Sequence, residues 1–405
     1  MRLIYPATPG GPLPSSSRRA LALYLGVVQF FFATTWTIYV LYLPQLAAQA
    51  GIDKRWVPWI LVADQLIFAV MDVIAGFWID RVRAGLGRYG GWILGVTVIS
   101  GLAFLSMGLF AVNAGILLTS LIVWAVTSSA LRSPPWALLG RYAATPSLPW
   151  LSALVLTGNA VAAAMAPYLG IALRGVSPTL PFLLSTATLV AAVLGLVMAE
   201  RRSVRSEAAA AEVSKEDPWR IALFFAALLL LALGFQIHFS LNSAPQYLRF
   251  AGADDLPWLM PVFWIGFNLL MFPAAGVVAR LGTVRTMALA GALGALAALA
   301  AVLAPGPAAL VGAQLAAGGA WGAASVAAYS AAIAFGRTGR EGRFLGTLFA
   351  MLALAAFVRI GLVASGLALD PALRTLLPWL PQTAWLLAAL LLACALRPAG
   401  ASRPA

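Results

Sequence analysis

Long apolar runs separated by short polar segments make up nearly the whole chain. The four longest runs without a charged residue cover 20–52, 89–131, 142–173 and 286–336. Two of them are interrupted by turn-forming residues, at 113–115 and at 305–307. Because about 20 apolar residues are enough for one helix to cross a lipid bilayer, the two interrupted runs each predict two crossings.

This pattern predicts an all-α membrane protein with twelve spanning helices. The expected spans are 21–43, 57–80, 91–112, 115–139, 149–172, 179–199, 219–244, 257–280, 284–303, 308–335, 344–368 and 375–396. The one long polar stretch, 200–220, holds five acidic and five basic residues and falls between spans six and seven. We therefore expect two halves of six helices, 20–199 and 219–396, joined by a cytoplasmic linker, 200–218. The remaining residues form two cytoplasmic tails, a disordered one at 1–19 and a second at 397–405.

The same short pattern of residues occurs in both expected halves, about 200 residues apart. Residues 42–59 read YLPQLAAQAGIDKRWVPW, and residues 243–258 read SAPQYLRFAGADDLPW. With small gaps, the first segment matches the second at Pro-Gln, at Ala-Gly, at an aspartate and at Pro-Trp. Duplicated halves around a central site are a building plan of secondary transporters, so the repeat already favours transport as the function.

Composition and charge agree with a membrane location. The chain is 62% hydrophobic and 10% charged, whereas about a quarter of the residues of a soluble domain are charged. Of the 26 basic residues, nineteen fall on the side of the N-terminus and five on the other side. Since basic residues accumulate in cytoplasmic segments, we expect both termini in the cytoplasm and a bacterial-type inner (plasma) membrane. This orientation accounts for the net charge of +13, and no basic nucleic-acid-binding module is present.

Polar side chains at membrane depth follow the order of the helices in threes. The first helix of each triplet carries them on one stripe, whereas spans six, nine and twelve are almost wholly Ala, Leu and Val. A central aqueous cavity with a lipid-facing periphery requires this distribution, although residues of these types also hold neighbouring helices together. The candidate cavity residues are Gln29, Trp36, Trp124, Ser128, Arg132, His238, Asn242, Gln314, Trp321, Ser325 and Arg359.

Charged residues inside the expected spans are few, and each is costly enough to need a partner or a role. Span two contains Asp64 and Asp72, which are eight residues apart, or about 12 Å along the helix axis. Arg132 lies at a depth similar to that of Asp72, so the two form either a fixed structural ion pair or part of a functional site. The partner of Arg359 is open between a backbone carbonyl, a substrate anion and a carboxylate of the other half. His238 is expected either in the cavity or in a single hydrogen bond between helices.

Residues 71–94, which read MDVIAGFWIDRVRAGLGRYGGWIL, join spans two and three. Gly76 permits the close approach of a neighbouring helix. Asp80 is within reach of Arg81 and Arg88, so these residues are expected to form a gate that latches the cytoplasmic side in one conformation.

The pattern G-x-x-x-D-R followed by G-R in this segment resembles the loop between helices two and three of the major facilitator superfamily. Asp72, with Arg83 and Trp92 after it, is similar in particular to the glycoside-pentoside-hexuronide cation symporter branch, as is SPPWALLGRY at 133–142. The resemblance implies the major facilitator fold, with two pseudo-symmetric halves of six helices, and a cation-site carboxylate at Asp72. Asp64 has no counterpart in the motif and is a second candidate for cation coupling by its depth alone.

These features predict an ion-coupled secondary transporter that moves a small polar or amphipathic organic solute by alternating access. The coupling ion is expected to be a proton or sodium, with no other cofactor. The expected partners are the lipid bilayer and the small-molecule substrate, and the protein is expected to work as a monomer. A membrane enzyme such as a prenyltransferase needs acidic residues spaced by three or four to hold magnesium and diphosphate, whereas Asp64, Asp72 and Asp80 are spaced by eight. A non-transporting assembly factor or sensor on a transporter scaffold is the alternative that the sequence leaves open.

Overall fold

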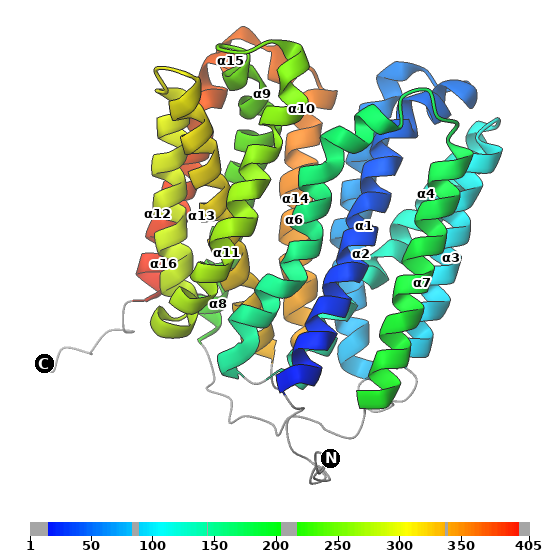
Figure 1. Ribbon diagram of the computed structural model, residues 1–405, viewed down its shortest axis with the longest axis horizontal. Helices are drawn as coiled ribbons and strands as arrows, with labels where there is room; N and C mark the ends of the chain where they lie inside the picture. Colours follow the sequence, from blue (N-terminus) through cyan, green and yellow to red (C-terminus); the bar gives the residue numbers. More distant parts are fainter. Residues whose placement is uncertain (1–14, 83–88, 144, 204–216, 337–338, 397–405) are drawn as a thin grey trace, which may run out of the picture.

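The computed structural model describes residues 15–82, 89–143, 145–203, 217–336 and 339–396, and the regular structure within these ranges is entirely helical. Within these ranges, twelve segments are long and apolar enough to cross a membrane, which confirms the predicted number of spans. The helices stand side by side in one bundle, with α1 beginning and α16 ending at the same end (Figure 1). We call this end the terminal end and the opposite end the distal end.

The spans are built from sixteen α-helices within the described ranges, because some spans contain more than one helix. The first six spans contain α1 (Ser15–Gln49), α2 (Val57–Val82), α3 (Tyr89–Phe110), α4 (Ala114–Ser128), α5 (Ser133–Tyr142), α6 (Leu148–Ala172) and α7 (Thr179–Ser203). The last six contain α8 (Pro218–Ile237), α9 (Ser243–Tyr247), α10 (Leu256–Leu259), α11 (Pro261–Leu281), α12 (Thr283–Val302), α13 (Pro307–Gly336), α14 (Glu341–Ala364), α15 (Pro371–Leu376) and α16 (Leu380–Ala395).

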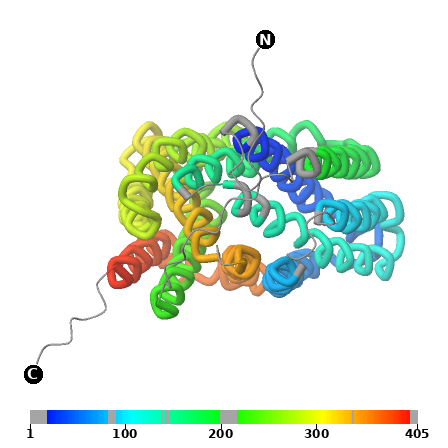
Figure 2. Tube along the Cα trace, turned by 90° about the horizontal axis from the view of Figure 1, so that it is seen from below, coloured from blue at the N-terminus to red at the C-terminus, as the bar shows by residue number. Residues whose placement is uncertain are grey.

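The first six spans form one group of helices and the last six a second group beside it, as the view from the terminal end shows (Figure 2). The groups meet where α2 packs along α14 and where α6 packs along α11. Glycine makes the first of these contacts close: Gly76 lies against the backbone of Gly342, and Gly346 lies against the carbonyl of Asp72. A Cβ at any of these glycines would overlap backbone atoms of the other helix, so small residues set the distance between the two groups.

Spans four and seven are broken, although each was predicted as one uninterrupted helix. After α4 a short 3-10 turn (Ser129–Leu131) follows, and α5 then begins with Ser133-Pro134-Pro135. Proline fits the first turn of a helix but lacks the N–H group that would bond back to the preceding turn, so the span breaks here. In span seven a π-helical turn, His238–Asn242, separates α8 from α9. Such turns are rare and occur often at functional sites.

Exposed tryptophans gather near the two ends of the bundle. Trp150 and Trp219 lie in the first turns of α6 and α8, at the terminal end, whereas Trp59, Trp258 and Trp379 lie near the distal end. The exposed side chains between them are mainly leucine, isoleucine, valine and phenylalanine. Tryptophan prefers the boundary between lipid and water, so this distribution is that of an integral membrane protein.

Candidate functional site

A cavity of about 330 Å³ lies between the two groups of helices. Residues of α1, α2, α6, α8, α11, α13 and α14 line it, together with Arg132 from the break between α4 and α5. Nine lining side chains are aromatic and two are arginines, and no described residue of the lining is acidic. The neutral polar side chains of the lining are Gln29, Gln65, Asn159, Gln236 and Ser325.

Six of the eleven candidate cavity residues line this space, namely Gln29, Trp36, Arg132, Trp321, Ser325 and Arg359. Gln29 donates to the carbonyl of Leu131 at 3.1 Å, and its own side-chain oxygen accepts from Asn159 at 3.3 Å. These two bonds tie α1 to α6 and to the break in span four. In the second half, the ring of Trp321 stacks on that of Phe235, with the centroids 4.8 Å apart and an interplanar angle of 7°.

The remaining two candidates of the first half, Trp124 and Ser128, are buried outside the cavity wall. Trp124 stacks behind Trp36, with the ring centroids 6.0 Å apart, and Ser128 donates to the carbonyl of Ala125 in its own helix. Contrary to expectation, neither residue lines the cavity. The rings of Trp36 and Phe68, which do line it, pack against Trp124 on the side of the cavity.

The remaining three candidates of the second half, His238, Asn242 and Gln314, also lie outside the lining. Nε2 of His238 and Oε1 of Gln314 are 3.0 Å apart, and the Gln314 amide donates to Gln246 at 2.9 Å. Asn242 donates to the carbonyl of Leu377 at 2.8 Å. All three are buried, and their hydrogen bonds hold the broken span seven to its neighbours. His238 thus occupies the second of its two expected positions, in a hydrogen bond between helices.

Asp72 and Arg132 form an ion pair beneath the cavity, with Nη1 of Arg132 3.2 Å from Oδ2 of Asp72. Asp72 is fully buried on α2, whereas the Arg132 side chain retains 14% exposure and reaches the lining. The guanidinium lies over the ring of Phe68 in the first half and over that of Phe349 in the second, at 5.1 and 5.2 Å from the centroids. The ion pair therefore lies where the two halves meet.

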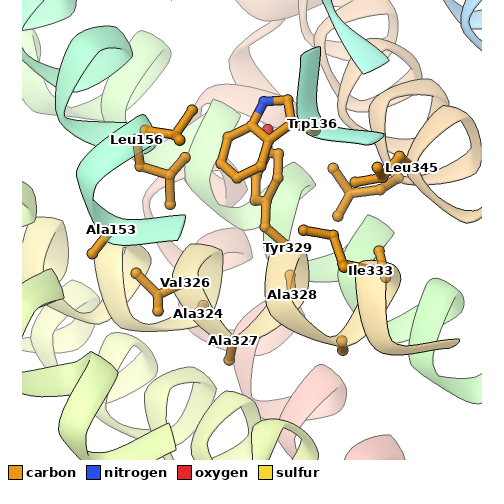
Figure 3. Packing of buried hydrophobic residues seen from close by; sticks show 14 of the residues in the cluster. Trp136, Ala153, Leu156, Ala324, Val326, Ala327, Ala328, Tyr329, Ile333 and Leu345 are labelled. Atoms are coloured by element: carbon orange, nitrogen blue, oxygen red, sulfur yellow. The ribbon is translucent and has the colours of Figure 1, made fainter. Parts of the chain in front are cut away.

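Below this ion pair, toward the terminal end, aromatic and aliphatic side chains of both halves close the cavity. Trp136 of α5 packs on Tyr329 of α13, with the ring centroids 4.2 Å apart. Figure 3 shows these two rings surrounded by Leu156 of α6, Ile333 of α13 and Leu345 of α14. We call this set of five residues the terminal plug. All five side chains are buried, so they separate the cavity from the terminal end.

Asp64, the other candidate for cation coupling, is fully buried one layer behind the cavity wall. Its Oδ2 accepts a hydrogen bond from the hydroxyl of Tyr39, and its Oδ1 has no partner among the described residues. Gln65, the next residue in the chain, and Trp36, whose ring packs against that of Tyr39, do line the cavity. The structure therefore separates the two carboxylates: Asp72 has a cationic partner, and Asp64 has a phenol.

The expected gate residue Asp80 is near the end of α2, and it contacts the beginning of α14 in the other half of the protein. Its carboxylate accepts from the backbone N–H groups of Gly342 at 2.8 Å and Arg343 at 2.9 Å. These groups belong to the first turn of α14, where backbone donors lack helical partners and a negative charge is favoured. Arg81 is exposed, and Arg88 lies outside the described residues.

Several lining residues were not among the candidates. Phe68 and Phe267 both line the cavity, and each lies ten residues after the proline of its Pro-Trp pair. The register of the repeat was therefore a signal that would have identified them. Gln236 and Phe349 have no such signal, because only their contacts across the cavity single them out.

Comparison with known proteins agrees with this architecture. The profile of the Major Facilitator Superfamily matches residues 25–359, and no curated protein sequence matches the chain. Similar solved structures include the human organic anion transporter MFSD10 (TETRAN), with a TM-score of 0.72, 16% identity, and 94% of this chain and 100% of that chain covered. A bacterial homologue of the iron transporter ferroportin in the outward-facing state has a TM-score of 0.67 and 15% identity, with 92% of this chain and 98% of that chain covered. FucP in the outward conformation has a TM-score of 0.69 and 12% identity, with 94% and 100% covered.

At these identities the likeness establishes the fold, and the proteins compared are transporters rather than enzymes. The profile match covers most of the chain, and it includes the repeat, the Asp80 contact and every lining residue of the cavity except Ile360. The chain belongs to the major facilitator superfamily.

Proposed function

We propose that this protein is an ion-coupled secondary transporter that moves a small amphipathic organic solute across the membrane by alternating access. The observation that supports this most directly is a cavity between the two halves with the terminal plug on one side of it. A rocking motion that separates Trp136 from Tyr329 and closes the distal end exposes the same cavity to the other side.

The bias of basic residues supports a terminal end in the cytoplasm of a bacterial-type inner membrane, with both chain termini inside. Two of the similar structures are in an outward conformation. This supports an outward-facing conformation for the state described here. One chain supplies the entire lining of the cavity, as a working monomer requires.

Ion coupling is supported by the two buried carboxylates of α2. Asp72 is within 3.2 Å of Arg132, so a proton or sodium ion that binds the carboxylate competes directly with the guanidinium. FucP, named as a fucose:proton symporter, is similar in fold. The motif around Asp72 favours the glycoside-pentoside-hexuronide cation symporter branch. The alternative of a non-transporting scaffold has no comparable structural feature in its favour.

Transport is tested by comparing metabolite accumulation between a deletion strain and an overexpressing strain, and then by uptake of the solutes that differ into proteoliposomes. We expect accumulation under an imposed proton or sodium gradient with the parent protein and none with Asp72→Asn. If no solute differs between the strains and no gradient drives uptake, the protein is a scaffold without transport, and the proposal fails.

A further inference from the structure

We infer that the cavity recognises monovalent organic anions, with the anionic group at Arg359 and a planar apolar body against the aromatic wall beside it. This inference rests on the proposed transport function and specifies its substrate class. It comes from the unequal environments of the two arginines that line the cavity.

The charge of Arg132 is already balanced. Its guanidinium pairs with Asp72 and is covered on two sides by the rings of Phe68 and Phe349. A substrate anion has to displace the Asp72 carboxylate to reach this cation. While the pair is intact, Arg132 and Asp72 together add no net charge to the cavity.

Arg359 is different, because no carboxylate of the described residues forms an ion pair with it. Among the described residues its one hydrogen bond runs from Nε to Oε1 of Gln236 at 3.3 Å, and Gln236 is a neutral amide. The side chain is partly buried and lines the cavity. An unpaired cation at membrane depth is costly, and the terminal nitrogens of a guanidinium fit a carboxylate or sulfonate in a paired geometry. Among the described residues of the lining, none of which is acidic, Arg359 therefore supplies one positive charge that no carboxylate balances.

The apolar part of the ligand is specified by what lies next to Arg359. Gln236 follows Phe235 in α8. The ring of Phe235 stacks on that of Trp321 and makes an edge contact with that of Trp264, with the ring centroids 5.7 Å apart in the second case. All three rings line the cavity. Planar groups bind such surfaces by stacking, and a volume of about 330 Å³ is at the small end of ligand pockets. The site thus suits one or two fused rings that carry a single negative group.

Arg359 also has the position of a first contact for a solute that enters from the distal end. It lies eighteen residues after the start of α14 at the terminal end, or about 27 Å along the helix axis. Asp72 lies against Gly346, much nearer the terminal end of α14. The free cation is therefore closer to the distal entrance than the ion pair is, and an anion reaches Arg359 before it reaches Arg132.

The test is a binding assay on the purified full chain with four probes that share the naphthalene ring system and differ in charge. Naphthoate is a monovalent anion, naphthamide its neutral counterpart, naphthylmethylamine a cation and naphthalene dicarboxylate a divalent anion. We expect naphthoate to raise the melting temperature and to bind about tenfold or more tightly than naphthamide, with the cation binding weakest. Equal affinity for naphthoate and naphthamide overturns the anion site, and tighter binding of the dicarboxylate overturns the count of one free charge.

The variant Arg359→Gln should reduce the preference for naphthoate over naphthamide to near unity, and Arg359→Lys should keep part of it. Arg374→Gln, which removes an exposed arginine at the distal end, is the matched control and should bind as the parent does. A preference that survives Arg359→Gln contradicts the assignment. If this variant does not fold, the four probes on the parent protein still decide the charge class. Because binding is measured without transport, a failed uptake assay counts against the transporter proposal alone.

Discussion

Arg132 and Tyr329 occupy the same position in the two halves of the repeat, and both line the cavity. Each lies four residues after a serine and eight after a tryptophan, in the series Trp124, Ser128, Arg132 and the series Trp321, Ser325, Tyr329. On the neighbouring helix, the repeat sets Met71 of α2 against Met271 of α11, and so places Phe272 where α2 has Asp72. One half therefore carries an ion pair at a position where the other carries a phenol and a phenyl ring. This asymmetry favours the first half as the site of the ion coupling that we propose.

Replacing Asp72 by Asn should abolish accumulation against a gradient while the protein stays folded. Asn keeps the size of the side chain but supplies neither a site for a proton nor a charged ligand for sodium. Exchange of solute without a gradient should persist, and gradient-driven uptake in proteoliposomes measures the difference. Asp254→Asn, at an exposed position in a 3-10 turn at the distal end, is the control. Normal accumulation by Asp72→Asn would mean that Asp72 serves only as a structural partner of Arg132.

Most of the fold follows from the sequence because lipid imposes simple rules. A spanning helix needs a long apolar run, so charge-free intervals and their breakers count the spans without any knowledge of packing. The breaks within spans four and seven were missed. The segment Ser133-Pro134-Pro135 lies inside a run apolar enough to be one helix, and only the missing backbone N–H groups end it there.

The cavity was predictable only in part, because helical periodicity tells which residues share a face and not what that face contacts. Trp36 and Trp321 line the cavity, whereas Trp124, on a stripe of the same kind, stacks behind Trp36. His238 finds its partner in Gln314, seventy-six positions away, and no local pattern encodes that contact. The register of the repeat carries more information, since it pairs Phe68 with Phe267.

Asp64→Asn should have a smaller effect on transport than Asp72→Asn, because Asn can still accept the hydrogen bond from Tyr39. Tyr39→Phe should lower the stability of the fold more than Asp64→Asn does. It removes the only hydrogen-bond donor that the described residues offer to the fully buried carboxyl of Asp64, at a cost of about 1–3 kcal/mol in the free energy of unfolding. Thermal unfolding in detergent measures the stability of both variants. The double variant Tyr39→Phe, Asp64→Asn should be more stable than Tyr39→Phe alone. Equal stability of the double variant and Tyr39→Phe would contradict a coupling between Tyr39 and Asp64.

Gly346→Ala should separate α2 from α14 and destabilise the state described here. The added Cβ would overlap the backbone carbonyl of Asp72, and backbone atoms of two packed helices cannot yield as a flexible side chain does. We expect a loss of about 1–3 kcal/mol in the free energy of unfolding. Gly361→Ala on the same helix is the matched control, since no atom lies within 4 Å of its added Cβ. A stability of Gly346→Ala equal to that of the control would show that the helices do not pack this closely.

The contact of Asp80 with α14 gives the sharpest test of the gate. The carboxylate accepts from Gly342 and Arg343 across the boundary between the halves, and a negative charge at the start of a helix is worth about 0.3–1 kcal/mol or more when partly buried. Asp80→Asn removes this charge and should shift the protein toward opening at the terminal end. A cysteine in place of the fully buried Ala153, in a Cys394→Ala background, should then react faster with a thiol reagent supplied from that side.

Asp370→Asn is the matched control for this experiment. Asp370 also accepts from the first N–H groups of a helix, those of Ala372 and Leu373 in α15, but it does so within one half. Loss of this cap should leave the labelling of the cysteine at position 153 unchanged, because no contact between the halves is broken. If Asp80→Asn labels at the parent rate and transports normally, the carboxylate caps α14 without controlling the gate, and closure of the terminal end depends on Trp136 and Tyr329 instead.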